Sequence, residues 1–397
     1  MLFRRPKLGN SGNVAIITAL CMPLIIGGAG LGVEVGYDHY EQVKLQQAAD
    51  AAAFAGGVEL RRGSTLSVVT STATAVAQQN GSASSTDTVT ILSPAPAGPG
   101  TVKATLARNE ARIFSGFFVN TPLIITVNAT AQISSAANAC ILALDPTASN
   151  AAQFSGNSTT TLSNCVVMAN SISSSAVNVQ GSAQLYTPCI YAVGGVSLAA
   201  GSAHMTSCSA PQTGQGPVGD PFSTLPMPDD TTPCLNGNSS NLSPGRYCNG
   251  LSFKSNSTLS PGVYVISGGT LQANANANVT GAGVTIVLLD DASISFNGNA
   301  HFNISAPTSG PYSGFLFVGG RSNTSAITIN GDSSSSMTGN IYFPSQAVSY
   351  QGNFTGTNGC THIVAKTVQW TGNATVGVDC SAYGMGTVPI GAVTLIG

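Results

Sequence analysis

Cysteines are the side chains with the clearest chemistry in this chain of 397 residues. One of the nine, Cys21, lies in a long apolar stretch, and the other eight follow residue 138. An even number of cysteines in an exported domain is typical of disulfides, and no Cys-x-x-Cys pair or Cys/His cluster has the spacing of a zinc site. The eight candidates for disulfides are Cys140, Cys165, Cys189, Cys208, Cys234, Cys248, Cys360 and Cys380.

Three of these cysteines begin similar apolar segments. The segments are Cys140-Ile-Leu-Ala, Cys165-Val-Val-Met and Cys189-Ile-Tyr-Ala. Parallel strands that stack about 4.8 Å apart bring equivalent positions within the Cα separation of a disulfide, so cysteines that are neighbours in sequence should pair. The pairs that we favour are Cys140 with Cys165, Cys189 with Cys208, Cys234 with Cys248, and Cys360 with Cys380. A bond between Cys165 and Cys189 stays open, because stacked positions are chemically equivalent.

Carboxylates give a weaker signal for catalysis. The adjacent acids are Asp229-Asp230 and Asp290-Asp291, and neither pair has a nearby Lys, Arg or His in the sequence. A polysaccharide-active enzyme needs clustered carboxylates with basic partners, or a metal. We therefore expect no catalytic residue and no cofactor. The alternative is an enzyme whose site brings together acidic and basic side chains from distant parts of the sequence.

An Asp-x-Ser-x-Ser pattern occurs at Asp291–Ser295 and at Asp332–Ser336. Such oxygen-rich patterns hold Mg²⁺ in von Willebrand A domains. The chain after each pattern lacks the alternating helices of that doubly wound fold. We therefore expect these side chains to face solvent and to hold no metal.

A short repeat must position these groups. Two apolar residues separated by one polar residue are followed by a turn with Gly, and successive glycines are about 20 to 25 residues apart. This period is typical of a solenoid in which the apolar pair points inward, and we predict a right-handed parallel β-helix over residues 138–397. The clearest copies are Val177–Gly181, Ile294–Gly298, Ile327–Gly331, Val348–Gly352 and Val368–Gly372. A proline-rich segment at 210–244 interrupts the repeat and predicts a long loop or an excursion across one face.

The beginning of the chain has a different character. An uncharged stretch starts at Asn13 and Val14, contains Pro23 and Gly28, and ends at Val33. Its length matches the roughly 20 residues that cross a bilayer as a helix. Basic residues in the tail 1–12 precede it and acidic residues follow it, which predicts a cytoplasmic N-terminus. A cleaved signal peptide is the alternative, but the apolar run is long and the helical pattern continues over 34–62.

The segment 63–137 is mixed. A helix is predicted over 64–79, and strands are predicted at 88–92, 101–108 and 122–133, with a proline- and glycine-rich turn at 93–100. This pattern resembles a pilin-like α+β module behind a long N-terminal helix.

The N-terminal motifs also resemble a known family. Four short motifs are similar, in order and spacing, to the first segment of TadG-like proteins of Flp (tight adherence, Tad) pilus assembly. They are Gly12-Asn-Val-Ala-Ile-Ile, Pro23-Leu, Gly32-Val-Glu-Val-Gly-Tyr and Leu45-Gln-Gln-Ala-Ala-Asp. The resemblance covers about residues 9–60. It implies a single-pass protein of the bacterial inner membrane whose bulk lies in the periplasm or outside the cell.

Composition limits the partners. Only 7% of the residues are charged and the net charge is −2, which argues against nucleic-acid binding. The partners that we expect are membrane lipid, other pilus-assembly or pilin proteins, and a second copy of this chain through the N-terminal helix. The expected function is non-enzymatic pilus assembly or adhesion, and an exported adhesin or S-layer-like solenoid is the alternative.

Overall fold

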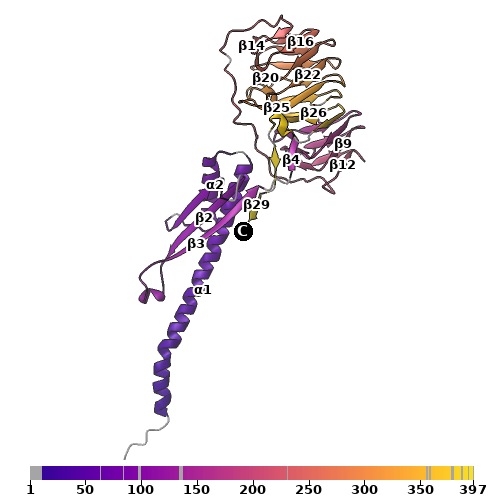
Figure 1. Ribbon diagram of the computed structural model, residues 1–397. Helices are drawn as coiled ribbons and strands as arrows, with labels where there is room; N and C mark the ends of the chain where they lie inside the picture. Colours follow the sequence, from indigo (N-terminus) through magenta and orange to yellow (C-terminus); the bar gives the residue numbers. More distant parts are fainter. Residues whose placement is uncertain are drawn as a thin grey trace, which may run out of the picture. The chain divides into compact units, whose positions relative to one another are not determined.

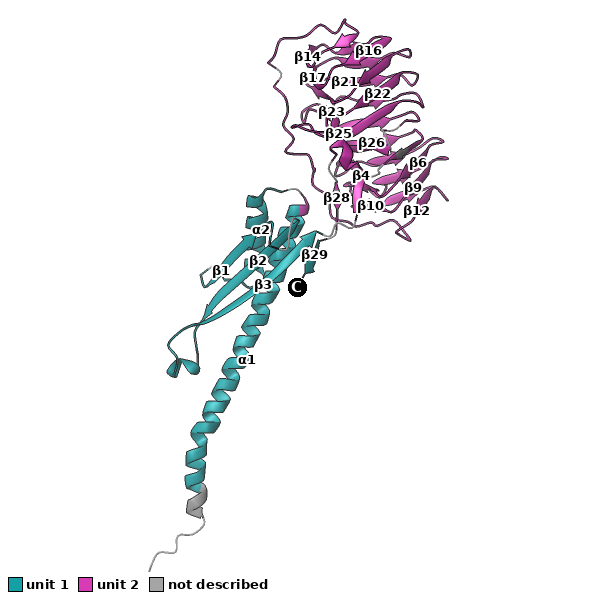
Figure 2. Cartoon of the chain, in the orientation of Figure 1, with its two compact units in different colours: residues 1–60, 64–133, 393–397 teal, residues 61–63, 134–392 magenta. Residues whose placement is uncertain are grey.

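The chain divides into two compact units, which Figures 1 and 2 show for the computed structural model. The structure describes residues 11–62, 64–83, 85–96, 100–133, 137–229, 231–354, 356, 359–376, 380–385, 388–391 and 393–396. Unit 1 consists of residues 1–60, 64–133 and 393–397, and unit 2 of residues 61–63 and 134–392. The basic tail predicted for residues 1–12 lies almost entirely outside the described residues.

Unit 1 is built on one long helix, α1 (Ser11–Arg61), which contains both the predicted span and its helical extension. The C-terminal half of α1 buries small side chains, among them Ala48, Ala49 and Ala52. These pack with α2 (Leu66–Gln79) against one antiparallel sheet in the order β1-β2-β3-β29. Its strands are β1 (Asp87–Leu92), β2 (Thr101–Glu110), β3 (Leu123–Ile133) and β29 (Val393–Ile396), with the short 3-10 helix η1 (Ser115–Phe117) between β2 and β3.

Strand β29 departs from the expected domain boundary. The sequence placed residues 138–397 in the solenoid, but Val393–Ile396 pair antiparallel with Thr130–Ile133 of β3. In the sequence, most of unit 2 therefore lies between β3 and β29, two strands that are paired in the unit 1 sheet.

Unit 2 is a parallel β-solenoid, as the repeat predicted, and its strands form three faces. The first face contains β4 (Ala137–Ala143), β7 (Val166–Ala169), β10 (Ile190–Ala192), β14 (Gly245–Cys248), β17 (Gly262–Ser267), β20 (Val284–Leu289), β23 (Phe315–Gly319) and parts of β25 (Ser336–Tyr350) and β26 (Thr361–Trp370). The second face contains β5 (Ala152–Phe154), β8 (Val177–Val179), β11 (Val196–Leu198), β15 (Leu251–Phe253), β18 (Thr270–Ala273), β21 (Ser293–Phe296), β24 (Ile327–Ile329) and the ends of β25 and β26.

The third face is shared by two groups of strands. One group contains β6 (Thr159–Leu162), β9 (Gln184–Thr187), β12 (Ala203–Met205) and β27 (Ala374–Val376). The other contains β13 (Asn241–Leu242), β16 (Asn256–Leu259), β19 (Asn278–Gly281), β22 (His301–Ser305) and the start of β25. The remaining elements of the unit are η3 (Ser381–Tyr383) and β28 (Pro389–Ile390).

The coils do not stack in chain order. The first three coils extend from β4 through β7 to β10, which forms one end of the stack. The chain then reappears at β14, at the opposite end, and stacks back through β17, β20 and β23 to β25 and β26. The last complete coil stacks on the first one, because β26 pairs with β4 and β5. This pairing joins the two runs of coils into one continuous stack.

Residues 206–234 connect the two ends, and we call them the strap. Contacts of the strap follow its sequence along the stack: Gln215 donates to the carbonyl of Ala192, Val218 exchanges two hydrogen bonds with Asn170, and Asp220 accepts one from Tyr342 at 2.6 Å. Figure 1 shows this segment running beside the first face. The predicted excursion across one face is therefore a packed connection.

The interior is a ladder of apolar rungs. On the second face, Ile329 pairs with Tyr350, Tyr350 with Trp370, and Trp370 with Phe154, all at most 1% exposed. The rings of Tyr350 and Trp370 stack with their centroids 4.2 Å apart. Each repeat found in the sequence is thus a second-face strand with the turn that follows it.

The repeat glycines are needed where these turns stack. A Cβ built on Gly372 would lie 1.5 Å from the carbonyl oxygen of Gly352 in the preceding coil. Gly352 itself has φ of +94°, a conformation that other L-residues rarely adopt. The period of glycines therefore reports direct contact between coil backbones.

Candidate functional site

The N-terminal half of α1 is an exposed apolar surface. Leu20, Leu24 and Ile25 are at least 67% exposed, and no residue in the most apolar window of the helix is buried. In the part of the chain that the structure describes, α1 is the one helix long and apolar enough to cross a membrane. A soluble surface seldom gathers so many large apolar side chains, so this half of α1 requires an apolar environment.

The residues predicted to mark the span all lie in this helix. Asn13 and Val14 are in its first turns, Pro23 and Gly28 are internal, and Val33 is 72% exposed. A Cβ added at Gly27, Gly28 or Gly32 would meet nothing within 4 Å, so these glycines leave open backbone. Such openings permit close approach of another helix.

Charged groups hold the middle of α1 to the sheet of unit 1. Arg108 on β2 forms ion pairs with Glu41 of α1 and with Asp87 of β1, the latter at 2.7 Å. Burial raises the pKa of Asp87, but hydrogen bonds from Arg108, from the Ala83 amide and from Thr86 outweigh it and bring the pKa to about 2. The sequence analysis did not identify this cluster, because its members are far apart in the chain.

Four disulfides cross-link unit 2, and each joins sequence neighbours. The bonds are Cys140–Cys165, Cys189–Cys208, Cys234–Cys248 and Cys360–Cys380, with Cα separations of 5.3 to 5.6 Å. They link the first two coils, the start of the strap to β10, the end of the strap to β14, and the last coil to the segment that follows it. Cys21 is free and exposed on the apolar half of α1.

One polar cluster on the solenoid surrounds His301. Its Nδ1 atom lies 3.2 Å from Asp332 Oδ1 and 3.1 Å from Ser334 Oγ. Asp332 also accepts hydrogen bonds from Ser334 and Ser335. Burial raises the pKa of Asp332, but its hydrogen bonds with His301, Ser334 and Ser335 outweigh burial and lower the pKa. In a Ser-His-Asp relay the serine and the aspartate contact different ring nitrogens, whereas here both contact the same one. The cluster has the geometry of a hydrogen-bonded turn.

The other acidic sequence motifs also serve local structure. Asp229 accepts hydrogen bonds from Thr231, and Asp230 lies outside the described residues. In the pattern at Asp291–Ser295, the Asp291 carbonyl accepts from Ser325 and the Ser293 hydroxyl contacts Thr270. Among the described residues, no group of three or more His, Cys, Asp or Glu side chains could hold a metal ion.

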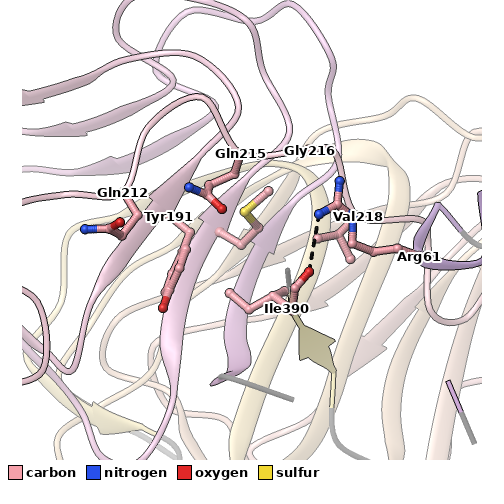
Figure 3. Close-up of a pocket in the computed structure, with 9 residues that line it drawn as sticks. Arg61, Tyr191, Gln212, Gln215, Gly216, Val218 and Ile390 are labelled. Atoms are coloured by element: carbon pink, nitrogen blue, oxygen red, sulfur yellow. Dashed lines mark hydrogen bonds between the residues drawn. The ribbon is translucent and has the colours of Figure 1, made fainter. Parts of the chain in front are cut away.

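A cavity of about 290 Å³ lies on unit 2 beside the start of the strap (Figure 3). Its apolar lining includes Met168, Tyr191 and Ile390. Arg61 reaches its edge and donates from Nη1 to the Gly391 carbonyl at 3.3 Å. Burial, with a smaller contribution from Arg62, lowers the pKa of Arg61. The described lining contains no carboxylate that could act as a general acid or base with it.

An outer layer of unit 2 was missed by the sequence analysis. Strap residues Phe222 and Val218 pack on apolar side chains that point away from the coil interior, such as Tyr342 and Val318. The signal was present in the continuous apolar runs of the first face, for example Phe315–Gly319, since such runs indicate strands buried on both sides.

Comparison with known proteins gives one match. Residues 12–59 match the family model described as putative Flp pilus-assembly TadE/G-like. The matched segment covers the exposed apolar half of α1 and most of the half that packs in unit 1, in agreement with the resemblance identified from the motifs. No curated protein and no solved structure matches the chain.

Proposed function

We propose that this protein is a non-enzymatic, membrane-anchored component of Flp/Tad pilus assembly or adhesion that carries a disulfide-linked β-solenoid outside the cytoplasm. The observation that carries the proposal is the family match over residues 12–59, which coincides with the exposed apolar helix. The four disulfides support export, because disulfides form and persist in oxidising compartments.

The proposed orientation places the N-terminus in the cytoplasm of a bacterium and unit 2 in the periplasm or beyond. Arg4, Arg5 and Lys7 precede the span, and short basic flanks stay cytoplasmic. Other pilus-assembly proteins, pilins or a second copy of the chain are the proposed partners, and the open glycines of α1 offer one surface for them.

A topology and function assay tests this proposal. A reporter active only outside the cytoplasm, fused after Gly57, should be active, and changing Arg4, Arg5 and Lys7 to Glu should reduce its activity. Deletion of the gene should abolish pilus-dependent adherence. A mature protein that lacks residues 1–60 would instead favour a released surface adhesin, and cleavage of polysaccharide by the purified protein would favour an enzyme.

A further inference from the structure

The segment between β2 and β3 concentrates exposed apolar side chains, and we call residues 113–119 the aromatic loop. Ile113 is 61% exposed, Phe117 84%, Phe118 79% and Val119 41%. Phe114 joins the two exposed rings, with centroids 6.5 Å from Phe117 and 6.3 Å from Phe118. Monomeric soluble proteins rarely expose a contiguous patch of this kind, so its surface requires a partner.

The aromatic loop lies directly on α1. A Cβ built at Gly30 would approach three carbon atoms of the Phe114 ring within 2.8 Å, so the ring covers the helix backbone at this glycine. Gly30 is inside the uncharged stretch 13–33, three residues before its end. At 1.5 Å of rise per residue, the contact lies roughly 5 Å inside the end of the span.

A buried carboxylate fixes the aromatic loop at this level. Glu34, the first charged residue after the span, is 5% exposed and accepts hydrogen bonds from the amides of Ile113 at 3.0 Å and Ser115 at 2.7 Å. The Ser115 hydroxyl donates a third at 2.8 Å. These bonds satisfy loop amides that water would otherwise solvate. The loop can thus enter an apolar phase with part of its backbone already paired.

We propose that the aromatic loop inserts into the membrane beside α1, in the leaflet at the C-terminal end of the span, as a second lipid contact. This inference rests on the proposed membrane anchoring of α1. Lipid is the occupant because the patch is continuous with the apolar face of the span at Gly30. Amphipathic elements at an interface bury aromatic side chains about 5–10 Å deep, which agrees with the depth of this contact. Arg112, at the base of the loop, would lie among the headgroups.

Tryptophan fluorescence of the full-length protein in phosphatidylcholine/phosphatidylglycerol vesicles tests the insertion. Phe117→Trp is compared with Leu92→Trp, and lipids brominated near the headgroup end of the acyl chains are the quenchers. Leu92 is the matched control, because it is 47% exposed and lies far from the aromatic loop. It pairs with Lys103 near the start of β2, whereas the loop follows Glu110 at the other end of that strand. The wild-type emission of Trp370, the only native tryptophan, is subtracted, so that no core residue is replaced.

The emission of the new tryptophan in Phe117→Trp should be blue-shifted, and the quencher should remove most of its intensity. The emission of Leu92→Trp should be unaffected. A third variant, Leu24→Trp, reports on α1 itself. Because Leu24 is nine residues, about 14 Å, before the end of the stretch 13–33, it is measured with lipids brominated near the methyl ends of the acyl chains. If Leu24→Trp is quenched and Phe117→Trp is not, the span is in lipid but the loop inference is wrong. If neither variant is quenched, the anchoring of α1 fails as well. An emission of Phe117→Trp that is blue-shifted but not quenched would place the loop against protein and also overturn the inference.

Discussion

At the scale of single residues, Arg108 shows how unit 1 fixes its long helix. One guanidinium lies within 4 Å of carboxylates from α1 and from both strands β1 and β2: Glu41, Asp87 and Glu110. Removing one partner of a buried charge pair destabilises a protein more than the pair itself contributes, because the other charge remains desolvated. Arg108 should therefore tolerate substitution poorly.

The pKa of Asp87 predicts a pH dependence for unit 1. The pKa of Asp87 is about 2 in the folded state and about 4 in an unfolded chain. Its contribution to the free energy of unfolding is therefore complete above pH 4 and is lost as the pH falls through 2. The contribution should be about 2 kcal/mol. Denaturant unfolding of wild type and Asp87→Asn between pH 2 and 7 should give curves that converge at the acid end. Parallel curves would mean that Asp87 does not titrate as stated.

His362 predicts a different pH window for unit 2. It is 7% exposed on β26, Nδ1 has no hydrogen-bond partner among the described residues, and burial lowers its pKa to about 4. An unfolded histidine titrates near pH 6.5, so unit 2 should keep full stability above that pH and lose about 3 kcal/mol as the pH falls to 4. The histidine proton resonances, followed by NMR, check the pKa. His362→Phe should abolish the loss of stability in this range.

The rungs of the solenoid provide the matched pair of substitutions. Ile329 is fully buried and its neighbour Thr328 points outward and is half-buried. Ile329→Asp should unfold unit 2, because it buries an unpaired charge, whereas Thr328→Asp should change stability by about 0.5 kcal/mol or less. Thermal unfolding followed by circular dichroism measures both. Equal damage from the two variants would show that the strand register is wrong.

These residue roles were not equally readable from the sequence. The alternation that places Ile329 inside and Thr328 outside is a local pattern, and it was predicted. The contact of Arg108 with Glu41 and Asp87 depends on how α1 and β1 lie against β2, which the sequence does not state. Glu34 likewise reads only as a charge that ends the span, and its hydrogen bonds to residues 113 and 115 depend on the length of the β2–β3 connection.

At the scale of elements, the strap packs along the first face of unit 2. Phe222 packs edge-to-face on Phe315 and Tyr342, with ring centroids 4.7 and 5.4 Å apart. Arg321 donates to the carbonyls of Phe222, Ser223 and Leu225 and so pairs strap backbone that forms no sheet. The strap is therefore a stabilising layer over the first face.

Phe222→Ala should release the middle of the strap. Truncating a partly buried aromatic side chain should cost about 3 kcal/mol, the lower end of the range for buried ones, and the freed segment should become accessible to proteases. Limited proteolysis followed by mass spectrometry should find new cleavage within 211–233 while the disulfides hold both strap ends. Phe222→Tyr, which keeps the ring, is the control. Protection unchanged in the alanine variant would contradict the packing described.

The sequence predicted the strands of the repeat and the existence of an excursion, but not its course. The coils carry similar rungs, so the repeat alone does not specify which coils are neighbours. The contacts of the strap with Asn170, Tyr342 and Arg321 join residues 48 to 122 positions apart, so its course is a property of the tertiary fold. Apolar residues on the outer side of the first face were the available clue to it.

At the scale of the whole molecule, unit 2 is an insertion in the sheet of unit 1. Strand β29 covers the edge of β3, and Val393 packs in the same hydrophobic cluster as Ala131. Gly57 of α1 also lies under Val393, since a Cβ there would come within 2.7 Å of that side chain. The last residues of the chain thus belong to the unit that contains its first residues.

Deleting residues 393–397 should therefore destabilise unit 1 and leave unit 2 intact. Loss of Val393 from the cluster and of one strand from the edge should cost about 2–3 kcal/mol. Hydrogen exchange should accelerate in β3 and in the C-terminal half of α1, with unchanged protection of β17 and β20. Faster exchange confined to unit 2 would show that the strand serves the solenoid instead.

The insertion also determines how the molecule carries a mechanical load. Both connections to unit 1 leave unit 2 beside β4, since β28 pairs with Ala137 and Asn138, and β4 has a neighbouring coil on each side. In a solenoid stacked in chain order, tension on the chain ends would pull on terminal coils, which have one neighbour and peel away singly. Here the exposed terminal coils are internal in the chain and bear no tension. A pulling force applied at these two connections acts on an interior coil of the stack, which would have to separate from a neighbour on each side at once.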